Sequence, residues 1–299
     1  MAVPTIYFLD ICSISHIKHF LGKRRFKDKK HEQSIKDLRD IDLAGNAVSC
    51  LPALMEKASD RKSKLTTDQF VVELQRDLAG MGKFFSSAKV AESAEFVETQ
   101  ARDVFGTDME DGTPEYLAFL EFANSLRLHG DTGRDRQFKT ARLLCDKAEE
   151  LGVSTSHPVV ITVVARVYKC EAARDVLKFA GNPENFNASN ALGDIQAISR
   201  VGGRLAQLVG AFVGKGKMFQ NWGFRTGDSA LVKLFTYFTH NGVEVTDGAD
   251  ESEKSYSVKI DEPSLFPELF GPNGEPKDDT CSQELDKLRK LLGARWPED

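Results

Sequence analysis

Four acidic side chains are placed where parallel strands and helices could present them to one site. Asp10 directly follows the apolar, β-prone residues 5–9, and Asp228 lies in the loop of FRTGDSAL, between a predicted strand and its helix. Glu56 comes one or two helical turns after a second predicted strand, and Asp194 lies among apolar neighbours on a predicted helix. Ligands of open parallel sheets bind beyond the carboxyl ends of the strands. We therefore expect these acids to face one crevice.

Converging carboxylates repel one another and are stable mainly around a hard dication, and oxygen ligands suit Mg²⁺ or Mn²⁺. Such ions lower the pKa of a bound water, orient it towards a phosphodiester and stabilise the leaving oxygen. The metal ligands expected here are Asp10, Asp194 and Asp228, and Glu56 completes the catalytic set, with Glu171 and Glu184 as alternatives to it. Ser13 and Thr226 are expected to hydrogen-bond the carboxylates without contacting the metal themselves.

The elements that must hold these acids suggest an α/β/α layered fold with a mainly parallel central sheet. Residues 5–9 and 46–49 are expected to be strands, as are a segment at FRTGD and the stretch VEVT. Between them, apolar residues recur at helical spacing, for example at Phe70, Leu74, Leu78 and Met81. We expect a discontinuous core at 1–60 and 182–260, a large helical insertion at 61–181, and an acidic C-terminal tail at 261–299 with one short helix.

The charge is unevenly distributed along the chain, although the net charge is only −5. Residues 18–39 hold nine Lys or Arg against three acids, directly after Asp10. This run and a few later cations form a candidate track for a nucleic-acid backbone. The residues assigned to it are Lys23, Arg24, Arg25, Lys27, Lys215, Lys217 and Arg225.

Composition and motifs exclude several other classes of protein. No apolar run reaches the length of a membrane span, and no signal segment opens the chain, so we expect a cytoplasmic protein without a membrane partner. The five cysteines are scattered, as expected for free thiols in a reducing compartment. The string VGKGKMF does not satisfy the phosphate-loop pattern, and the six histidines lack zinc-binding spacing. Cys12 stands where a dehalogenase-type phosphatase would need a second aspartate.

The strings FLDICSIS, AVSCLPALME, GDIQAIS and TGDSAL resemble, in this order, the acidic motifs of the PIN-domain nucleases. The resemblance covers roughly residues 5–60 and 185–247. It implies a PIN-like fold and a Mg²⁺- or Mn²⁺-dependent endonuclease, with RNA favoured over DNA as substrate. It also implies a role as a microbial toxin or defence effector, for which a protein regulator is a candidate partner.

Two other functions remain open from the sequence. In the first, the PIN-like core is inactive and the protein is an adaptor whose helical block and acidic tail bind a protein partner. In the second, the same acids form a narrower cleft that hydrolyses phosphoesters of small nucleotides. A response to Mn²⁺ that depends on Asp10 separates the nuclease from the adaptor.

Overall fold

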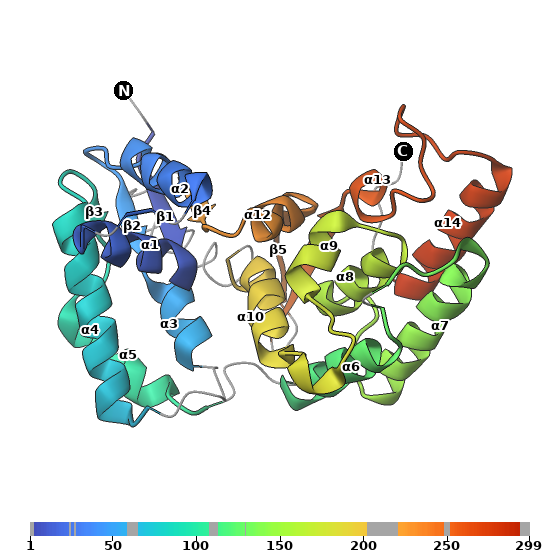
Figure 1. Cartoon of the computed structure of the whole chain (residues 1–299), viewed down its shortest axis with the longest axis horizontal. Helices are drawn as coiled ribbons and strands as arrows, with labels where there is room; N and C mark the ends of the chain where they lie inside the picture. The colour runs from blue at the N-terminus through green and yellow to red at the C-terminus, as the bar shows by residue number, and fades with distance from the viewer. Residues whose placement is uncertain are drawn as a thin grey trace. The chain divides into compact units, whose positions relative to one another are not determined.

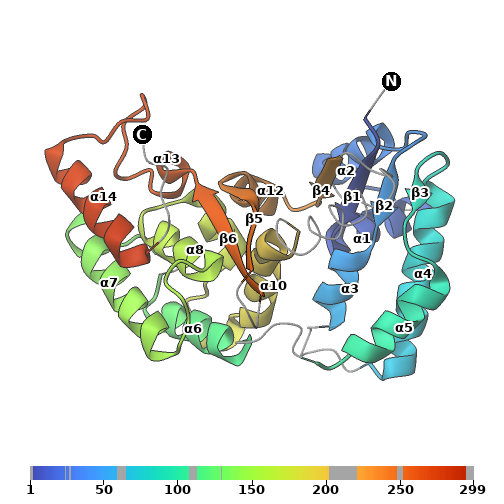
Figure 2. The ribbon, with the colours of Figure 1, turned by 180° about the vertical axis from the view of Figure 1, so that it is seen from behind.

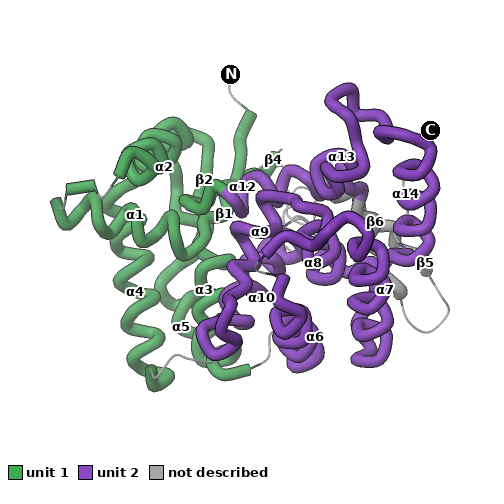
Figure 3. Tube along the Cα trace, turned by 45° about the vertical axis from the view of Figure 1, so that its right-hand side comes forward, with its two compact units in different colours: residues 1–111, 204–229 green, residues 112–203, 230–299 purple. Residues whose placement is uncertain are grey.

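The computed structural model describes residues 3–23, 25–26, 28–58, 65–107, 113–128, 130–201, 221–247 and 252–293. The candidate cations Arg24, Lys27, Lys215 and Lys217 lie outside these ranges. The chain forms two compact units (Figure 3). Unit 1 contains residues 1–111 and 204–229, and unit 2 contains residues 112–203 and 230–299.

Unit 1 is built on a four-stranded parallel sheet with the strand order β3-β2-β1-β4. The strands are β1 (Thr5–Leu9), β2 (Ala47–Ser49), β3 (Lys89–Val90) and β4 (Asn221–Arg225). The expectation of a parallel sheet is confirmed. β1 is nearly continuous in apolar residues because it is covered on both faces, which is the usual pattern for a central strand of a parallel sheet.

Five helices of unit 1 pack around this sheet (Figure 1). The apolar residues of the longest one, including Phe70, Leu74 and Met81, are buried in the core, as their helical spacing predicts. Thr66 begins this helix with a capping box completed by Gln69. The five helices are α1 (Ile11–Leu21), α2 (Lys29–Asp40), α3 (Leu51–Ala58), α4 (Thr67–Phe84) and α5 (Ala94–Val104).

An ion network centred on the buried Asp77 joins three of these helices. Asp77 on α4 has only 2% of its side chain exposed, and its two oxygens lie 2.6 Å from Lys18 Nζ and 2.7 Å from Lys57 Nζ. Lys57 Nζ also lies 2.6 Å from Glu73 Oε1. Lys18 and Lys57 come from α1 and α3. The carboxylate of Asp77 therefore holds α1, α3 and α4 at fixed positions.

Unit 2 is mainly helical, and α8 (Pro158–Val167) lies at its centre with every residue buried. Its Val and Ile content would suit a strand, but Pro158 in its first turn and its length favour the helix that is observed. The surrounding helices are α6 (Thr113–Ser125), α7 (Arg134–Glu150), α9 (Glu171–Leu177), the 3₁₀ helix η1 (Pro183–Asn185) and α10 (Ala188–Ser199), followed by α12 (Ser229–Thr236), α13 (Glu262–Leu265) and α14 (Asp279–Leu292).

The strand expected at VEVT exists but is not part of the parallel sheet. It lies within β5 (Phe238–Asp247), which pairs antiparallel with β6 (Ser252–Ile260) as a separate hairpin (Figure 2). The two strands are close in sequence, so their pairing closes only a short loop and is local. Most of the predicted short helix in the tail is confirmed as part of α14, which begins earlier than expected.

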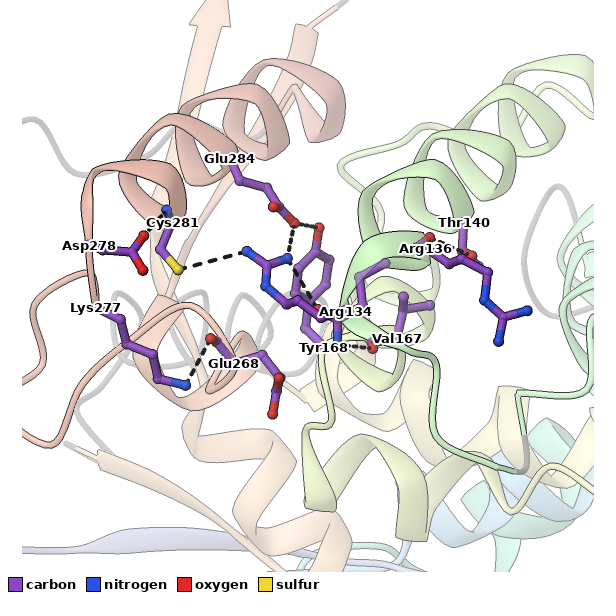
Figure 4. Close-up of polar contacts among 11 residues, drawn as sticks. Arg134, Arg136, Thr140, Val167, Tyr168, Glu268, Lys277, Asp278, Cys281 and Glu284 are labelled. Carbon is purple, nitrogen blue, oxygen red and sulfur yellow. Dashed lines mark hydrogen bonds and ion pairs between the residues drawn. The ribbon is translucent and has the colours of Figure 1, made fainter.

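A polar cluster fastens α14 to the rest of unit 2 (Figure 4). Glu284 Oε1 accepts hydrogen bonds from Arg134 Nη1 at 2.8 Å and from the hydroxyl of Tyr168 at 2.6 Å. Tyr168 is fully buried, and Arg134 Nη2 lies 3.7 Å from Cys281 Sγ. Each group in this cluster already has a protein partner. The cluster is therefore explained by packing of the C-terminal helix.

The boundaries of the two units differ from the domain boundaries expected from the sequence. The expected insertion begins at residue 61, but α4, β3 and α5 belong to unit 1. β3 extends the parallel sheet, and α4 and α5 pack against α1 and α3. Residues 182–203, expected in the core, belong to unit 2 with α10.

Candidate active site

Asp10 lies where the sequence predicts it, at the carboxyl end of β1, and it also caps the helix that follows. Its Oδ1 accepts a hydrogen bond of 2.7 Å from the N–H of Ser13, which satisfies a free amide of the first turn of α1. Its own N–H donates to the carbonyl of Arg225 at the end of β4. Only 5% of Asp10 is exposed. The carboxylate is thus fixed between β1, α1 and the end of β4.

The turn after β4 brings a second acid to the same place. The hydroxyl of Thr226 hydrogen-bonds the Asp10 carboxylate, and its Oγ1 accepts from the N–H of Asp228 at 2.9 Å. The Ser13 hydroxyl donates to the Arg225 carbonyl at 2.9 Å. Thr226 therefore links the Asp10 side chain to the main chain of Asp228.

The electrostatic environment of Asp10 suits a carboxylate that binds a cation. Burial raises the pKa of Asp10, while hydrogen bonds from Thr226 and Ser13 oppose the rise and the charge of Asp228 adds to it. A buried carboxylate whose pKa is raised partly by a neighbouring carboxylate binds a dication readily, because the charge of the ion offsets the repulsion. Mg²⁺ is commonly held by one or two carboxylates, with water and substrate phosphate as its other ligands. The donor chemistry present here fits Mg²⁺ or Mn²⁺.

The position of this acid pair in the sheet is informative. From β1 the chain proceeds to β2 and β3 on one side, whereas β4 is added on the other side of β1. The point where the strand order reverses is the place at which open parallel sheets bind ligands. Asp10 and Asp228 follow the two strands that meet there. The pair therefore lies at the topological switch point.

Glu92 is an acid at this edge of the sheet that the sequence analysis missed. It follows β3, and its carboxylate accepts from the Ser49 hydroxyl at 2.5 Å and from the Cys50 N–H at 3.1 Å, both at the end of β2. Although the residue as a whole is partly exposed, burial of its carboxyl group raises the pKa. The one local feature of the sequence that could have indicated Glu92 is its place, as an acid, between Val90 and Ser93, the residue that caps the next helix.

The other predicted acids belong to α3 or to unit 2. Glu56 is the sixth residue of α3 in unit 1 and is half-buried. Asp194 belongs to unit 2, where its Oδ2 lies 3.8 Å from Lys178 Nζ and accepts from Asn190 Nδ2 at 3.2 Å. These contacts explain how a half-buried carboxylate is tolerated on α10. The alternatives Glu171 and Glu184 are exposed residues of unit 2.

Three of the seven candidate cations lie within the described ranges. Lys23 and Arg25 are exposed beyond the end of α1, where a polyanion could reach them. Arg225 is half-buried at the end of β4, and its guanidinium lies 4.8 Å from the ring centre of Tyr7 on β1. Its Nη1 also donates to the carbonyl of Phe224. The Arg225 side chain therefore packs along the sheet over Tyr7.

Among the described residues, no three or more His, Cys, Asp or Glu side chains are already gathered in a metal-binding arrangement. Within the same ranges, no helix has the length and apolar character needed to cross a membrane.

Comparisons with models of protein families, with curated proteins and with solved structures found no match to this chain.

Proposed function

We propose that this protein is a metal-dependent endonuclease that hydrolyses phosphodiester bonds, with RNA favoured over DNA. The observation that carries the proposal is the pair of acids, Asp10 and Asp228, that follows the two strands at the topological switch point of the parallel sheet. The order of the acidic motifs, which resembles that of PIN-domain nucleases, supports the same function. We propose accordingly that unit 1 is a PIN-like, three-layer α/β/α core.

In this proposal the chain's own groups hold and orient the reacting parts. Asp10 and Asp228 would hold Mg²⁺ or Mn²⁺, with Glu56 and Asp194 as the further proposed acids. Such an ion, when bound, lowers the pKa of a coordinated water and offsets charge on the phosphodiester. Ser13 and Thr226 keep the Asp10 carboxylate oriented through the hydrogen bonds described above. The carboxylates are thereby kept in place before substrate arrives.

The exposed cations beyond α1 support a polyanionic substrate. Lys23 and Arg25 would contact phosphates, together with Arg24, Lys27, Lys215, Lys217 and Arg225. All five cysteines are free thiols, which supports action in a reducing, cytoplasmic setting. A role as a toxin or defence effector, with a protein regulator, remains part of the proposal.

The test is cleavage of labelled single-stranded RNA and DNA in the presence of Mn²⁺, by the wild type and by Asp10→Asn and Asp228→Asn. We expect cleavage by the wild type, faster on RNA, and a loss of at least about 100-fold in each variant, as for other groups that act in the transition state. Asp278→Asn is the matched control, because Asp278 caps α14 as Asp10 caps α1. Full activity in Asp10→Asn would refute the assignment.

The adaptor is the alternative function, and one observation favours it. Asp194, one of the expected metal ligands, is already paired with Lys178. If the wild type neither cleaves nucleic acid nor is stabilised by Mn²⁺, the nuclease proposal fails and the adaptor remains. Cleavage of small nucleotide phosphoesters alone would indicate the third function.

A further inference from the structure

One face of α1 is directed at the turn that carries Asp228. Asp10, Ser13 and His16 are spaced by three residues, so their side chains lie near one another along the start of this helix. Asp10 and Ser13 bind the Arg225 carbonyl, and Asp10 also binds Thr226. His16 contacts the next residue along, Gly227.

The imidazole of His16 occupies the space beside Gly227 that a side chain would need. A Cβ atom added at Gly227 would lie 2.3 Å from His16 Cε1, 2.8 Å from Nδ1 and 3.2 Å from Nε2. Gly227 is not among the glycines with positive φ, so its backbone conformation does not itself require glycine. The reason for glycine at this position is the space that the ring occupies.

The ring of His16 is itself held in place from α2. Its Nδ1 lies 2.8 Å from Ser34 Oγ, and its centroid lies 3.9 Å from that of His31 in an edge-to-face arrangement. Burial, with the neighbouring His31, lowers the pKa of His16 to about 4. The ring is therefore neutral near pH 7 and can share a hydrogen with the Ser34 hydroxyl.

We infer that His16 is a positioning residue that fixes the turn of Thr226, Gly227 and Asp228 and so holds Asp228 beside Asp10. This inference rests on the proposed metal site. The ring packs against Gly227 and so limits movement of the turn, and its contact with Ser34 keeps the ring from rotating away. The ring adds to the hydrogen bond between Thr226 and Asp10 and to the hydrogen bond of the Asp228 N–H to Thr226 Oγ1.

The test is a double-mutant cycle read by Mn²⁺ affinity, measured from the electron paramagnetic resonance of the free ion. Residues that orient metal ligands typically change metal affinity by about 10- to 100-fold, so we expect His16→Ala to weaken Mn²⁺ binding about 10-fold. Gly227→Ala should weaken it at least as much, because the new methyl group displaces the ring. In the His16→Ala background, Gly227→Ala should have no further effect, because its clash has been removed.

Two further variants separate positioning from general stability. His16→Phe keeps a flat ring against Gly227 and should bind Mn²⁺ within about 3-fold of the wild type, since the ring contact carries the effect. His157→Ala is the matched control: His157 lies in unit 2, is stacked on Tyr116 at 4.4 Å, and has a pKa likewise lowered by burial to about 4. This control should lower the melting temperature without changing Mn²⁺ affinity.

The outcomes distinguish this inference from the proposed function. Wild-type protein that binds Mn²⁺, with His16→Ala binding equally well, overturns the positioning role and leaves the metal site intact. Additive effects of His16→Ala and Gly227→Ala also overturn it, because then the two residues do not act together. A wild type that binds no Mn²⁺ overturns the proposed function, and with it the inference that depends on it.

Discussion

Replacing Asp10 by Asn should separate the metal-binding role of this residue from its structural role. Asn is as good a helix cap as Asp, and its side-chain oxygen can still accept the 2.7 Å hydrogen bond from the Ser13 N–H. The structural change is therefore small, within about 1 kcal/mol of unfolding free energy. What is removed is the negative charge that would bind a cation.

The magnitude expected from the metal follows from mass action. At a Mn²⁺ concentration 100 times its dissociation constant, the wild type should gain about 2.7 kcal/mol of stability. For a protein of 299 residues, that gain raises the melting temperature by about 4 °C. Asp10→Asn should lose this rise, and Asp278→Asn, a cap of the same geometry in unit 2, should keep it.

The pH dependence of the metal-free protein gives a second measurement on the same variant. Because the folded-state pKa of Asp10 is raised above 3.8, the charged form disfavours folding. The destabilisation is absent below pH 3.8, develops between pH 3.8 and the raised folded-state pKa, and is complete above that pKa. Asp10→Asn lacks this titration, so without metal near pH 7 we expect it to be at least as stable as the wild type.

Thermal unfolding followed by circular dichroism, with and without Mn²⁺ and between pH 3 and pH 8, measures both effects. The reasoning is refuted if Asp10→Asn keeps the full Mn²⁺ shift, since the carboxylate would then not be a ligand. It is also refuted if the metal-free variant is several kcal/mol less stable than the wild type, because the charge would then be required for folding.

Three further substitutions, with Lys36→Ala as a control, test the fold around and away from the site, each by urea unfolding. Glu92→Ala should cost about 2–3 kcal/mol, because the Ser49 hydroxyl and the Cys50 N–H lose their acceptor; no change would mean that water replaces it. Asp77→Ala should cost about 1.5–3 kcal/mol, because it removes two charged hydrogen bonds while Lys57 keeps Glu73 and Lys18 is partly exposed. Breaking the exposed Lys36–Glu32 pair by Lys36→Ala should cost under about 0.5 kcal/mol. Tyr168→Phe removes the bond to Glu284 and should cost about 1.5–3 kcal/mol while leaving the response to Mn²⁺ unchanged; a changed response would contradict its purely structural role.

The sequence was sufficient to predict an element where the local residue pattern agrees with the observed structure. β1 and the position of Asp10 at its end were predictable, because five β-prone residues precede an acid that caps a helix. The start of α10 at Asn187 and the helical nature of α8 were also predictable from capping and length. In each case the determining interaction lies within a few residues along the chain.

Contacts between distant residues set the limit of prediction. β3 has only two residues, and its strand character comes from pairing with β2, so no periodic pattern identified it or the acid Glu92 that follows. Lys178, the residue after α9, meets Asp194 on α10. The contact of His16 with Gly227 joins positions far apart in the sequence and leaves no local signal.

The acid pair depends on the least local strand pairing in the sheet. Ser13 and Arg225, which meet at the β1–β4 boundary, are 212 residues apart, whereas Thr5 and Asn46, at the β1–β2 boundary, are 41 residues apart. For flexible chains, loop closure over the longer separation costs about 1.5 kcal/mol more. A cation held by Asp10 and Asp228 would offset this cost, because it joins the same two strands. Metal binding and the docking of β4 are then linked, so that the proposed site and the completed sheet stabilise each other.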